Sequence, residues 1–360
     1  MINFTGDLFI GNDSFQIGDS IKALLATGKY IVSNFENVFN DTSLEMRSDK
    51  SSILTFSKKY LESYISNFQN SLIFTLGNNH LHDLGKDGIE STINLLNRYD
   101  NILHTGIGKL QQLQSPLIVE DEGKKIAILS VSTDEPEVMA ILASNKHLGV
   151  LSMNDCSINN IISTYKKKVD FFIMIPHWGK EYIKYPSVQQ RKKAYDWIDA
   201  GADLIIGHHP HIIQGKEKYN DKWIYYSLGN YIFPEFFYKN GIKHCWKKEN
   251  TESILLSVDF KDGINITEHG LFFDVSINVL NESKIAYNNF IKRSLILKTD
   301  IISIKKYYGI WQKELYNALK NEYSLKKKIT GYLPKHKDYG RIEFLFKRVL
   351  KKINKINGLN

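Results

Sequence analysis

Cysteine, proline and long hydrophobic runs are scarce in this chain. Its 360 residues include only 2 cysteines, Cys156 and Cys245, and only 7 prolines. Two distant cysteines exclude a disulfide framework and a cysteine-rich zinc site, and they fit a reducing compartment. The most apolar stretches, such as residues 171–175 and 254–260, are too short to span a bilayer and are typical of strands.

Several functional signatures are missing as well. The first residues show no basic segment followed by an apolar core, so we expect no signal peptide and a cytoplasmic protein. No Gly-x-x-x-x-Gly-Lys-Ser/Thr loop is present, so ATP use is not indicated. The chain also lacks a Gly-x-Ser-x-Gly elbow, which argues against a serine hydrolase.

Positive charge is concentrated at one end of the chain. Residues 291–360 contain 18 of the 47 Lys and Arg but only 5 of the 39 Asp and Glu, a net charge of +13 that leaves −5 for residues 1–290. This asymmetry predicts a mildly acidic body, residues 1–290, followed by a basic helical extension, residues 291–360.

Short apolar segments alternate with amphipathic ones along the body, a pattern typical of a layered α/β domain. We expect strands at residues 4–10, 31–35, 72–76, 126–132, 171–175, 204–206 and 223–227. Helices are expected at residues 57–69, 86–98, 157–167 and 187–200, the last with Ser187 as its N-cap. Residues 254–260 and 264–273 predict a β-hairpin.

Polar clusters stand at the ends of these strands. They are Gly6-Asp7, Asn34-Phe35-Glu36, Asn78-Asn79-His80, His177-Trp178-Gly179 and Gly207-His208-His209-Pro210-His211. Because ligands of open α/β sheets gather beyond the carboxyl ends of strands, we expect the clusters to converge. A mixed shell of Asp, Asn and His suits Mn, Fe or Zn. One or two such ions would polarise a phosphoryl oxygen, with a nearby His protonating the leaving group.

These clusters, with His177-Trp178-Gly179-Lys180-Glu181-Tyr182 and Tyr226-Ser227-Leu228-Gly229-Asn230-Tyr231, resemble the ordered motifs of the CapA family. CapA proteins are capsule and poly-γ-glutamate synthesis proteins of the calcineurin-like metallophosphoesterase superfamily. The resemblance spans residues 2–233 and implies a four-layer αββα metallophosphoesterase-like sandwich with a metal site at the strand ends.

The resemblance also implies roles for individual residues. The implied metal ligands are Asp7, Asn34, Glu36, Asn79, His177, His209 and His211, with His208 able to replace His209 by register. His80 resembles the histidine that meets the leaving group, and Asp83 either orients His80 or caps the following helix. The superfamily places a further histidine two residues after the first aspartate, where this chain has Phe9. Glu36 could supply that ligation, the site could hold one ion, or catalysis could be weak.

Five residues are candidates for substrate contact, and four of them have a structural alternative. They are Trp178, Glu181, Tyr182, His208 and Asn230. Trp178 could instead pack beside the site, Glu181 and Tyr182 could belong to a solvated loop, and Asn230 could shape the pocket floor.

Two classes of function follow from the resemblance. The first is a metal-dependent hydrolase, phosphoesterase-like, that acts on an anionic capsule or cell-surface polymer or its precursor. The second is a non-catalytic accessory protein of capsule or poly-γ-glutamate assembly or export. Amide-bond chemistry on glutamyl or uronic acid substrates follows only from the family's link to poly-γ-glutamate.

The basic extension has two interpretations of its own. Residues 307–328 and 342–356 predict two basic helices, the second with an apolar stripe. Such helices could hold the protein on the inner face of a membrane by binding anionic lipid, or they could be solvated helices packed on the body. No nucleic-acid motif accompanies the charge, so nucleic acid is not an expected partner.

Overall fold

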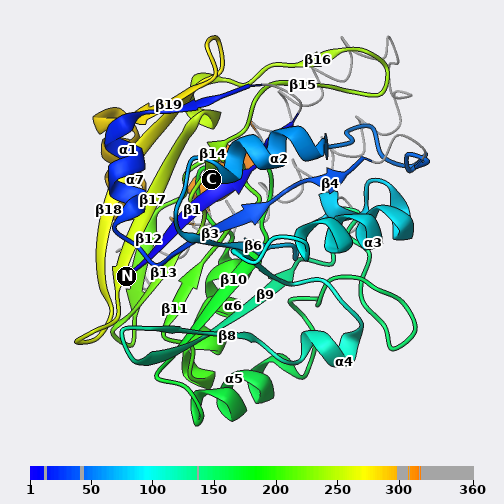
Figure 1. Cartoon of the computed structure of the whole chain (residues 1–360). Coiled ribbons are helices and arrows are strands. Elements are labelled where there is room, and N and C mark those ends of the chain that lie inside the picture. Colours follow the sequence, from blue (N-terminus) through cyan, green and yellow to red (C-terminus); the bar gives the residue numbers. More distant parts are fainter. Residues whose placement is uncertain are drawn as a thin grey trace, which may run out of the picture. The chain divides into compact units, whose positions relative to one another are not determined.

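The computed structural model describes residues 1–11, 14–40, 44–135, 138–297, 307, 309–315 and 317. All strands and helices labelled in Figure 1 belong to one compact unit, Met1–Glu314. Of the two predicted basic helices, the described part (307, 309–315 and 317) is helical, and the rest lies outside the described residues.

The first sheet carries one half of the predicted strand ends. Its strand order is β2–β19–β18–β17–β1–β3–β6–β7, and β14 pairs with β1. The bounds are β1 Ile2–Leu8, β2 Gln16–Ile17, β3 Tyr30–Phe35, β6 Ser71–Thr75, β7 Ile102–Thr105, β14 Asn230–Ile232, β17 Glu252–Asp259, β18 Asn265–Asp274 and β19 Val279–Glu282. Since β1, β3, β6 and β7 are parallel, their carboxyl ends lie at one edge of the sheet.

The second sheet carries the other half. Its order is β12–β13–β11–β10–β9–β8, with β9, β10, β11 and β13 parallel. The bounds are β8 Leu117–Asp121, β9 Lys124–Ser132, β10 Phe171–His177, β11 Leu204–Ile206, β12 Lys216–Tyr219 and β13 Lys222–Tyr225. Two short ladders complete the described strands, β4 Val38–Phe39 with β5 Thr55–Phe56 and β15 Phe236–Phe237 with β16 Lys243–His244.

Side chains that point alternately to the two faces of each strand form an apolar layer between the two sheets. In β10, Ile173 and Ile175 belong to the core cluster between the sheets, which also holds Val32 of β3 and Leu256 of β17. Successive strand residues point to opposite faces. Phe172 therefore packs on the outer side of the second sheet, against helices.

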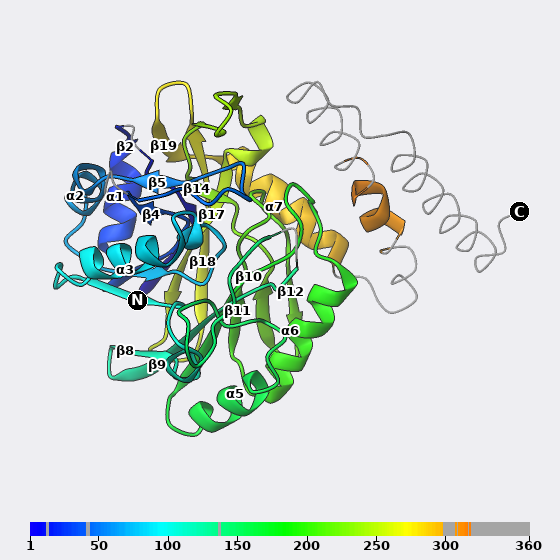
Figure 2. The ribbon, with the colours of Figure 1, turned by 90° about the vertical axis from the view of Figure 1, so that its right-hand side faces the viewer.

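Helices cover the outer face of each sheet. The bounds are α1 Asp19–Ala26, α2 Lys58–Ile65, α3 Gly85–Leu96, α4 Leu110–Leu113, α5 Ile158–Lys166, α6 Val188–Ala200 and α7 Lys284–Leu297, with short 3₁₀ turns at His80–His82 and Lys248–Asn250. Buried residues of α1, α2 and α3 pack on the first sheet, and those of α5 and α6 pack on the second. Figure 2 shows these two groups on opposite sides of the strands. The predicted four-layer αββα sandwich is therefore confirmed.

The predicted elements match the observed ones closely. Each of the seven expected strands and four expected helices overlaps an observed element. Ser187 caps α6 as expected, since its Oγ accepts from the Gln190 backbone N–H at 3.1 Å while Gln190 Oε1 accepts from the Ser187 N–H at 2.8 Å. The predicted hairpin is β17 and β18, which pair antiparallel.

The division at residue 290 stays a prediction. Helix α7 runs through that position and packs on β18 and β12. Among the described residues, no helix combines the length and apolar character needed to cross a membrane.

A close approach of two strands at Gly6 gives a first prediction. A Cβ at this position would lie 1.9 Å from the carbonyl oxygen of Gly229, which also accepts the Asp7 N–H at 2.8 Å. We expect Gly6→Ala to force β1 away from its neighbour and to lower the free energy of unfolding by about 3 kcal/mol or more.

The matched control is Gly309→Ala, because a Cβ there meets nothing within 4 Å. Its free energy of unfolding should be unchanged or rise by up to about 1 kcal/mol. Denaturant titration measures both, and equal effects of the two substitutions would contradict the packing argument.

Candidate metal centre

Side chains from both sheets meet at the carboxyl ends of β1, β3, β6, β10 and β11. The converging residues are Asp7, Asn34, Glu36, Asn79, His80, His177, His209 and His211, each at most 6% exposed. The expected convergence of distant sequence segments is confirmed by the distances between these side chains. Their individual roles stay predictions.

Glu36, directly after β3, lies at the centre. Its Oε2 is 3.6 Å from His211 Nε2 and 3.9 Å from His80 Nε2, and its Oε1 is 3.8 Å from His177 Nδ1. Although the side chain is fully buried, Oε2 accepts no hydrogen bond from any described residue. Burying a carboxylate oxygen without a partner costs folding free energy, and a cation bound at this position would offset that cost.

Asn34 organises the groups around Glu36. Its Nδ2 donates to Asp7 Oδ1 at 2.8 Å and to Glu36 Oε1 at 2.9 Å, and it lies 3.1 Å from His177 Nδ1. Its own oxygen accepts from Asn78 Nδ2 at 3.4 Å. The predicted role of Asn34 as an oxygen ligand does not fit this orientation, because its amide nitrogen faces the carboxylates. In this structure Asn34 positions the other groups.

His211 is held in one tautomer. Its Nδ1 lies 2.9 Å from Asn230 Oδ1, and since an amide oxygen only accepts, Nδ1 carries the proton. The Nε2 lone pair is then directed toward Glu36 and is available to a metal ion. Asn230 in turn donates to the backbone oxygen of Asn250 at 2.9 Å. Asn230, predicted to contact substrate, is placed to orient His211.

The remaining candidate ligands lie against one another. Asn79 Oδ1 is 3.1 Å from His177 Nε2, and the rings of His177 and His209 are 4.5 Å apart. The backbone N–H of His209 donates to Asp7 Oδ2 at 3.3 Å. His209 and His211 have φ values of 96° and 52°, in the left-handed region that side chains other than glycine rarely adopt. This strained turn carries both imidazoles, whose ring centroids lie 6.0 Å apart.

His80 is oriented by a chain of charged groups. Its Nδ1 lies 2.8 Å from Asp83 Oδ2, which also accepts from the Leu54 backbone N–H at 2.8 Å. The buried ammonium of Lys50 forms an ion pair with Asp83 and donates to the Asn79 backbone oxygen at 3.0 Å. Of the two roles left open for Asp83, the structure supports the orientation of His80.

Burial and crowding shift the pKa values at the centre. Burial, reinforced by the nearby charge of Asp7, raises the pKa of Glu36 well above 4.5. Burial and the neighbouring histidines lower the pKa of His177 and of His209 well below 6.5. The pKa of Asp83 is lowered, because His80 and Lys50 outweigh the effect of burial. The imidazoles of His177 and His209 are thus neutral, which is the form that binds metals.

The donor set fits a divalent cation. Ligand atoms of Asp7, Glu36 and His177 lie within 4.8 Å of one another, and so do those of Glu181, His209 and His211. Two carboxylates buried beside neutral imidazoles lack positive charge, and a divalent ion would supply it. The combination of imidazole and carboxylate suits borderline transition metals better than calcium.

Phe9 contributes packing at the position where the resemblance noted in the sequence implies a histidine in the superfamily. It belongs to a small buried cluster with Leu54 and Phe233, and its ring lies 5.2 Å from that of Phe233. The ring of Phe233 in turn lies 5.1 Å from that of His211. Position 9 therefore supplies no metal ligand. The carboxylate of Glu36 is the group that lies among the histidines.

Two predicted substrate contacts face elsewhere. Trp178 is fully buried, stacks on Trp197 at 5.5 Å and donates from Nε1 to the backbone oxygen of Tyr226 at 2.9 Å, so it packs beside the site, as its structural alternative had it. His208 Nε2 lies 3.0 Å from the Thr5 backbone oxygen, so this ring joins the two sheets.

Glu181 and Tyr182 remain beside the centre. Glu181 is exposed and groups with His209 and His211. Tyr182 is half-buried, has a φ of 64°, and its ring centroid lies 6.4 Å from that of His211.

Lys50 and His244 were not singled out from the sequence, and Asn78 was assigned no role of its own. Lys50 comes from a loop with no strand end to mark it. Asn78, whose Oδ1 accepts from the His80 backbone N–H at 3.0 Å, was noted only as part of a cluster. His244 lies on β16, and its signal was only that it is one of 11 histidines.

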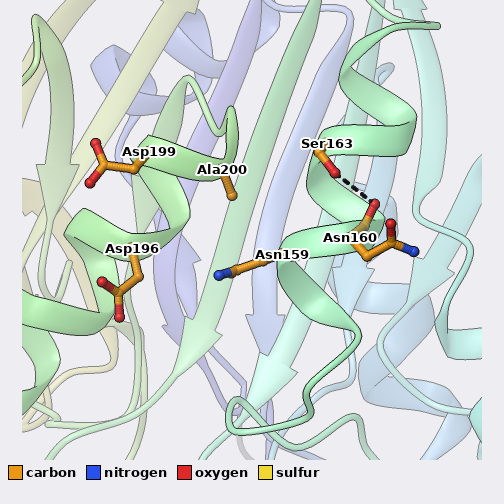
Figure 3. A pocket seen from close by; sticks show the side chains of 6 residues that line it. All are labelled: Asn159, Asn160, Ser163, Asp196, Asp199 and Ala200. Carbon is orange, nitrogen blue, oxygen red and sulfur yellow. Dashed lines mark hydrogen bonds between the residues drawn. The ribbon is translucent and has the colours of Figure 1, made fainter.

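A depression between α5 and α6 lies apart from this centre. It is lined by Asn159, Asn160, Ser163, Asp196, Asp199 and Ala200 (Figure 3), none of which belongs to the converging set. It sits on the outer helical layer and offers no comparable arrangement of ligands.

Comparison with known proteins gives a consistent family match. The family model described as "Bacterial capsule synthesis protein PGA_cap" matches residues 2–235. The chain is 28% identical over 242 residues to the PGA biosynthesis protein CapA of Bacillus subtilis (strain 168), covering 65% of this chain and 63% of the relative. It is 30% identical over 222 residues to the capsule biosynthesis protein CapA of Bacillus anthracis, covering 60% of this chain and 53% of the relative.

The match covers only part of these relatives, since the chain spans between about half and two thirds of their length. Among solved structures, the calcineurin-like phosphoesterase YfkN from Bacillus subtilis aligns with a TM-score of 0.38 and 13% identity over 81% of this chain and 95% of that one.

The buried carboxylate of Glu36 predicts that Glu36→Gln raises the melting temperature without metal and lowers it, relative to the wild type, in excess Mn²⁺. Its raised pKa means that the folded chain holds this proton more tightly than the unfolded chain does. The resulting stability is present below pH 4.5 and is lost as the pH rises through the folded-state value. In a chelator at neutral pH, Glu36→Gln should therefore melt at a higher temperature than the wild type.

Excess Mn²⁺ should reverse this order. A ligand at 100 times its dissociation constant stabilises a fold by about 2.7 kcal/mol, and the variant should bind Mn²⁺ about 100-fold more weakly. Calorimetric melting with and without the ion measures both effects. An unchanged Mn²⁺ affinity in Glu36→Gln would remove Glu36 from the ligand set.

Proposed function

The chain belongs to the bacterial capsule synthesis protein family PGA_cap, and we propose that it is a metal-dependent hydrolase of phosphoesters in the biosynthesis or modification of an anionic cell-surface polymer. The observation that carries the proposal is the fully buried carboxylate of Glu36. Its Oε2 has no hydrogen-bond partner among the described residues, and its two oxygens lie within 3.9 Å of imidazoles from three separate chain segments. Such a carboxylate supports a bound cation.

The residues that would hold the ion are Asp7, Glu36, Asn79, His177, His209 and His211. When bound, a divalent Mn, Fe or Zn ion supplies Lewis-acid polarisation of a phosphoryl oxygen. Asn34 keeps Asp7 and Glu36 in place through its hydrogen bonds of 2.8 and 2.9 Å. Asn230 fixes the His211 ring so that its Nε2 lone pair faces the centre.

The orientation of the His80 ring supports a catalytic metal site rather than one that only stabilises the fold. The ring's Nδ1 is bound to Asp83, so its Nε2 is the atom that points toward Glu36 and can hold a proton for the leaving group. The ion pair between Lys50 and Asp83 keeps this carboxylate charged, and a charged Asp83 stabilises the protonated imidazole. A site that only stabilised the fold would not need an oriented imidazole of this kind.

The polymer-related part of the proposal rests on the family. The two CapA relatives are named for PGA or capsule biosynthesis, and we extend that role to this chain. The corresponding partner is an anionic polymer or its precursor.

A second candidate is a non-catalytic accessory protein. The observation that favours it is Phe9, because an apolar side chain occupies a position where the superfamily has a histidine. Purified chain that binds metal yet hydrolyses neither aryl phosphates nor phosphodiesters would favour this candidate.

We also propose that the basic extension binds anionic lipid on the inner face of the membrane. The net charge of +13 in residues 291–360 supports it. A basic residue near an anionic surface contributes about 1 kcal/mol of binding energy, so several together hold a protein there.

His80 gives a prediction that separates chemistry from metal binding. His80→Ala should abolish Mn²⁺-stimulated hydrolysis of an aryl phosphate, a loss of about 100-fold or more, while retaining bound metal. Asp7→Ala and His177→Ala should lose both. Elemental analysis and initial rates measure the two properties. Equal loss of metal in all three variants would contradict the role of His80 as a proton donor.

The extension is tested by charge rather than by truncation. Lys326→Gln, Lys327→Gln and Lys328→Gln combined should weaken sedimentation of the full chain with anionic vesicles and leave aryl phosphate hydrolysis unchanged. A matched triple substitution to Arg keeps the charge and should keep binding. Identical sedimentation of the Gln and Arg variants would end the membrane proposal.

A further inference from the structure

An aromatic cluster borders the metal centre on the side of the β15–β16 hairpin. We define the aromatic cluster as Tyr182, Phe233, Phe236, Tyr238, His244 and Trp246. Within it, the His244 ring stacks on Phe236 at 4.7 Å and 14° and meets Trp246 at 4.3 Å and 77°. Phe236, Tyr238, Trp246 and Tyr182 are half-buried, so the cluster reaches the surface.

The cluster is continuous with the candidate ligands. The ring of His211 lies 5.1 Å from Phe233, 5.6 Å from Trp246 and 6.4 Å from Tyr182. A group held against these rings would therefore be adjacent to a phosphoryl group held at the metal centre.

His244 leaves one buried polar atom without a partner. The residue is 7% exposed, its Nδ1 lies 2.8 Å from the Tyr238 hydroxyl, and its Nε2 has no hydrogen-bond partner among the described residues. Burial lowers its pKa to about 4, so the ring is neutral near pH 7. An unpaired polar atom inside an aromatic surface is typical of a site that fixes a ligand's orientation.

We propose that the aromatic cluster is a subsite for the sugar ring of a phosphorylated hexose, with His244 Nε2 hydrogen-bonding a ring hydroxyl. The proposal rests on the proposed phosphoester hydrolysis at the metal centre and names the class of substrate. The apolar C–H faces of a pyranose pack on aromatic rings, while its hydroxyl groups need polar partners.

The ring angles favour a sugar over a planar base. Trp246 stands at 64° to Phe236, 65° to Tyr182 and 77° to His244. These rings are 4.3 to 6.3 Å apart and pack against one another, so they form a surface of edges and faces that a puckered ring with C–H bonds in several directions can cover. Tyr182 and His244 are closer to parallel, at 22° and 6.5 Å, so a nucleobase is the competing occupant.

The charges around the cluster favour a sugar over a γ-glutamyl chain. Lys243 pairs with Glu235 at 2.8 Å, and Lys184 pairs with Glu249 at 2.8 Å. Exposed Glu181 adds a negative charge beside His211. Lys180, whose charge reaches His209, forms no ion pair among the described residues, so a polymer with one carboxylate per residue would find one cation there and would need others that are not already paired.

Binding without turnover tests the subsite. The full chain in a chelator is titrated with hexose phosphate, glycerol phosphate, adenosine monophosphate and a γ-glutamyl oligomer, and affinities are read from ligand-observed NMR. Hexose phosphate should bind about 5-fold or more tighter than glycerol phosphate, which carries the same phosphate without a ring. Equal affinity for these two, or tighter binding of the nucleotide or the oligomer, would overturn the proposal.

The hairpin offers a matched pair of variants. Phe236 packs in the aromatic cluster, whereas its neighbour on β15, Phe237, is 63% exposed. Phe236→Ala should reduce the preference for hexose phosphate about 2- to 10-fold, and Phe237→Ala should leave it unchanged. His244→Phe replaces the imidazole by an apolar aromatic ring without Nε2 or Nδ1, and it should also reduce the preference.

Failure of this inference is distinct from failure of the proposed function. An active aryl phosphatase with no preference for hexose phosphate would overturn the subsite alone. A chain that prefers hexose phosphate in the chelator but hydrolyses no phosphoester with Mn²⁺ would keep the subsite and overturn the hydrolase. Equal effects of Phe236→Ala and Phe237→Ala would also overturn the subsite, whatever the melting temperatures of the variants.

Discussion

The burial of two carboxylates side by side is the constraint on which this site depends. Asp7 and Glu36 are both fully buried, they share the Asn34 amide, and the imidazoles of His177 and His209 beside them are neutral near pH 7. Without a compensating positive charge, this arrangement costs folding free energy. A divalent cation would remove the cost, and donors that are already in place would favour its tight binding.

The fold explains how such a group of residues can assemble from distant parts of the chain. Parallel strands in two stacked sheets present their carboxyl ends at one edge, and each strand contributes a side chain or the loop that follows it. The layer of apolar side chains between the sheets fixes the distance between the two halves. Backbone contacts such as that of Gly6 with Gly229 leave little freedom for β1, which carries Asp7.

Much of this was predictable from the sequence, because strand periodicity and the polar residues after each strand are local signals. A layered α/β domain, the strand ends and the convergence of Asp7, Glu36, Asn79 and the histidines follow from them, whereas the four-layer order was implied only by the resemblance to the CapA family. The orientation of Asn34 was not predictable, since only the surrounding hydrogen bonds decide which amide atom faces the carboxylates. Lys50 and His244 lie in segments whose positions depend on tertiary packing, and no local pattern marks them.

The most direct test is a crystal of the full chain soaked in Mn²⁺ and measured for anomalous scattering. The account predicts an anomalous peak at about 2.0–2.3 Å from donor atoms of Glu36 and of at least two of the histidines His177, His209 and His211. A peak elsewhere, or none at full Mn²⁺ concentration, would show that these carboxylates are buried together for another reason.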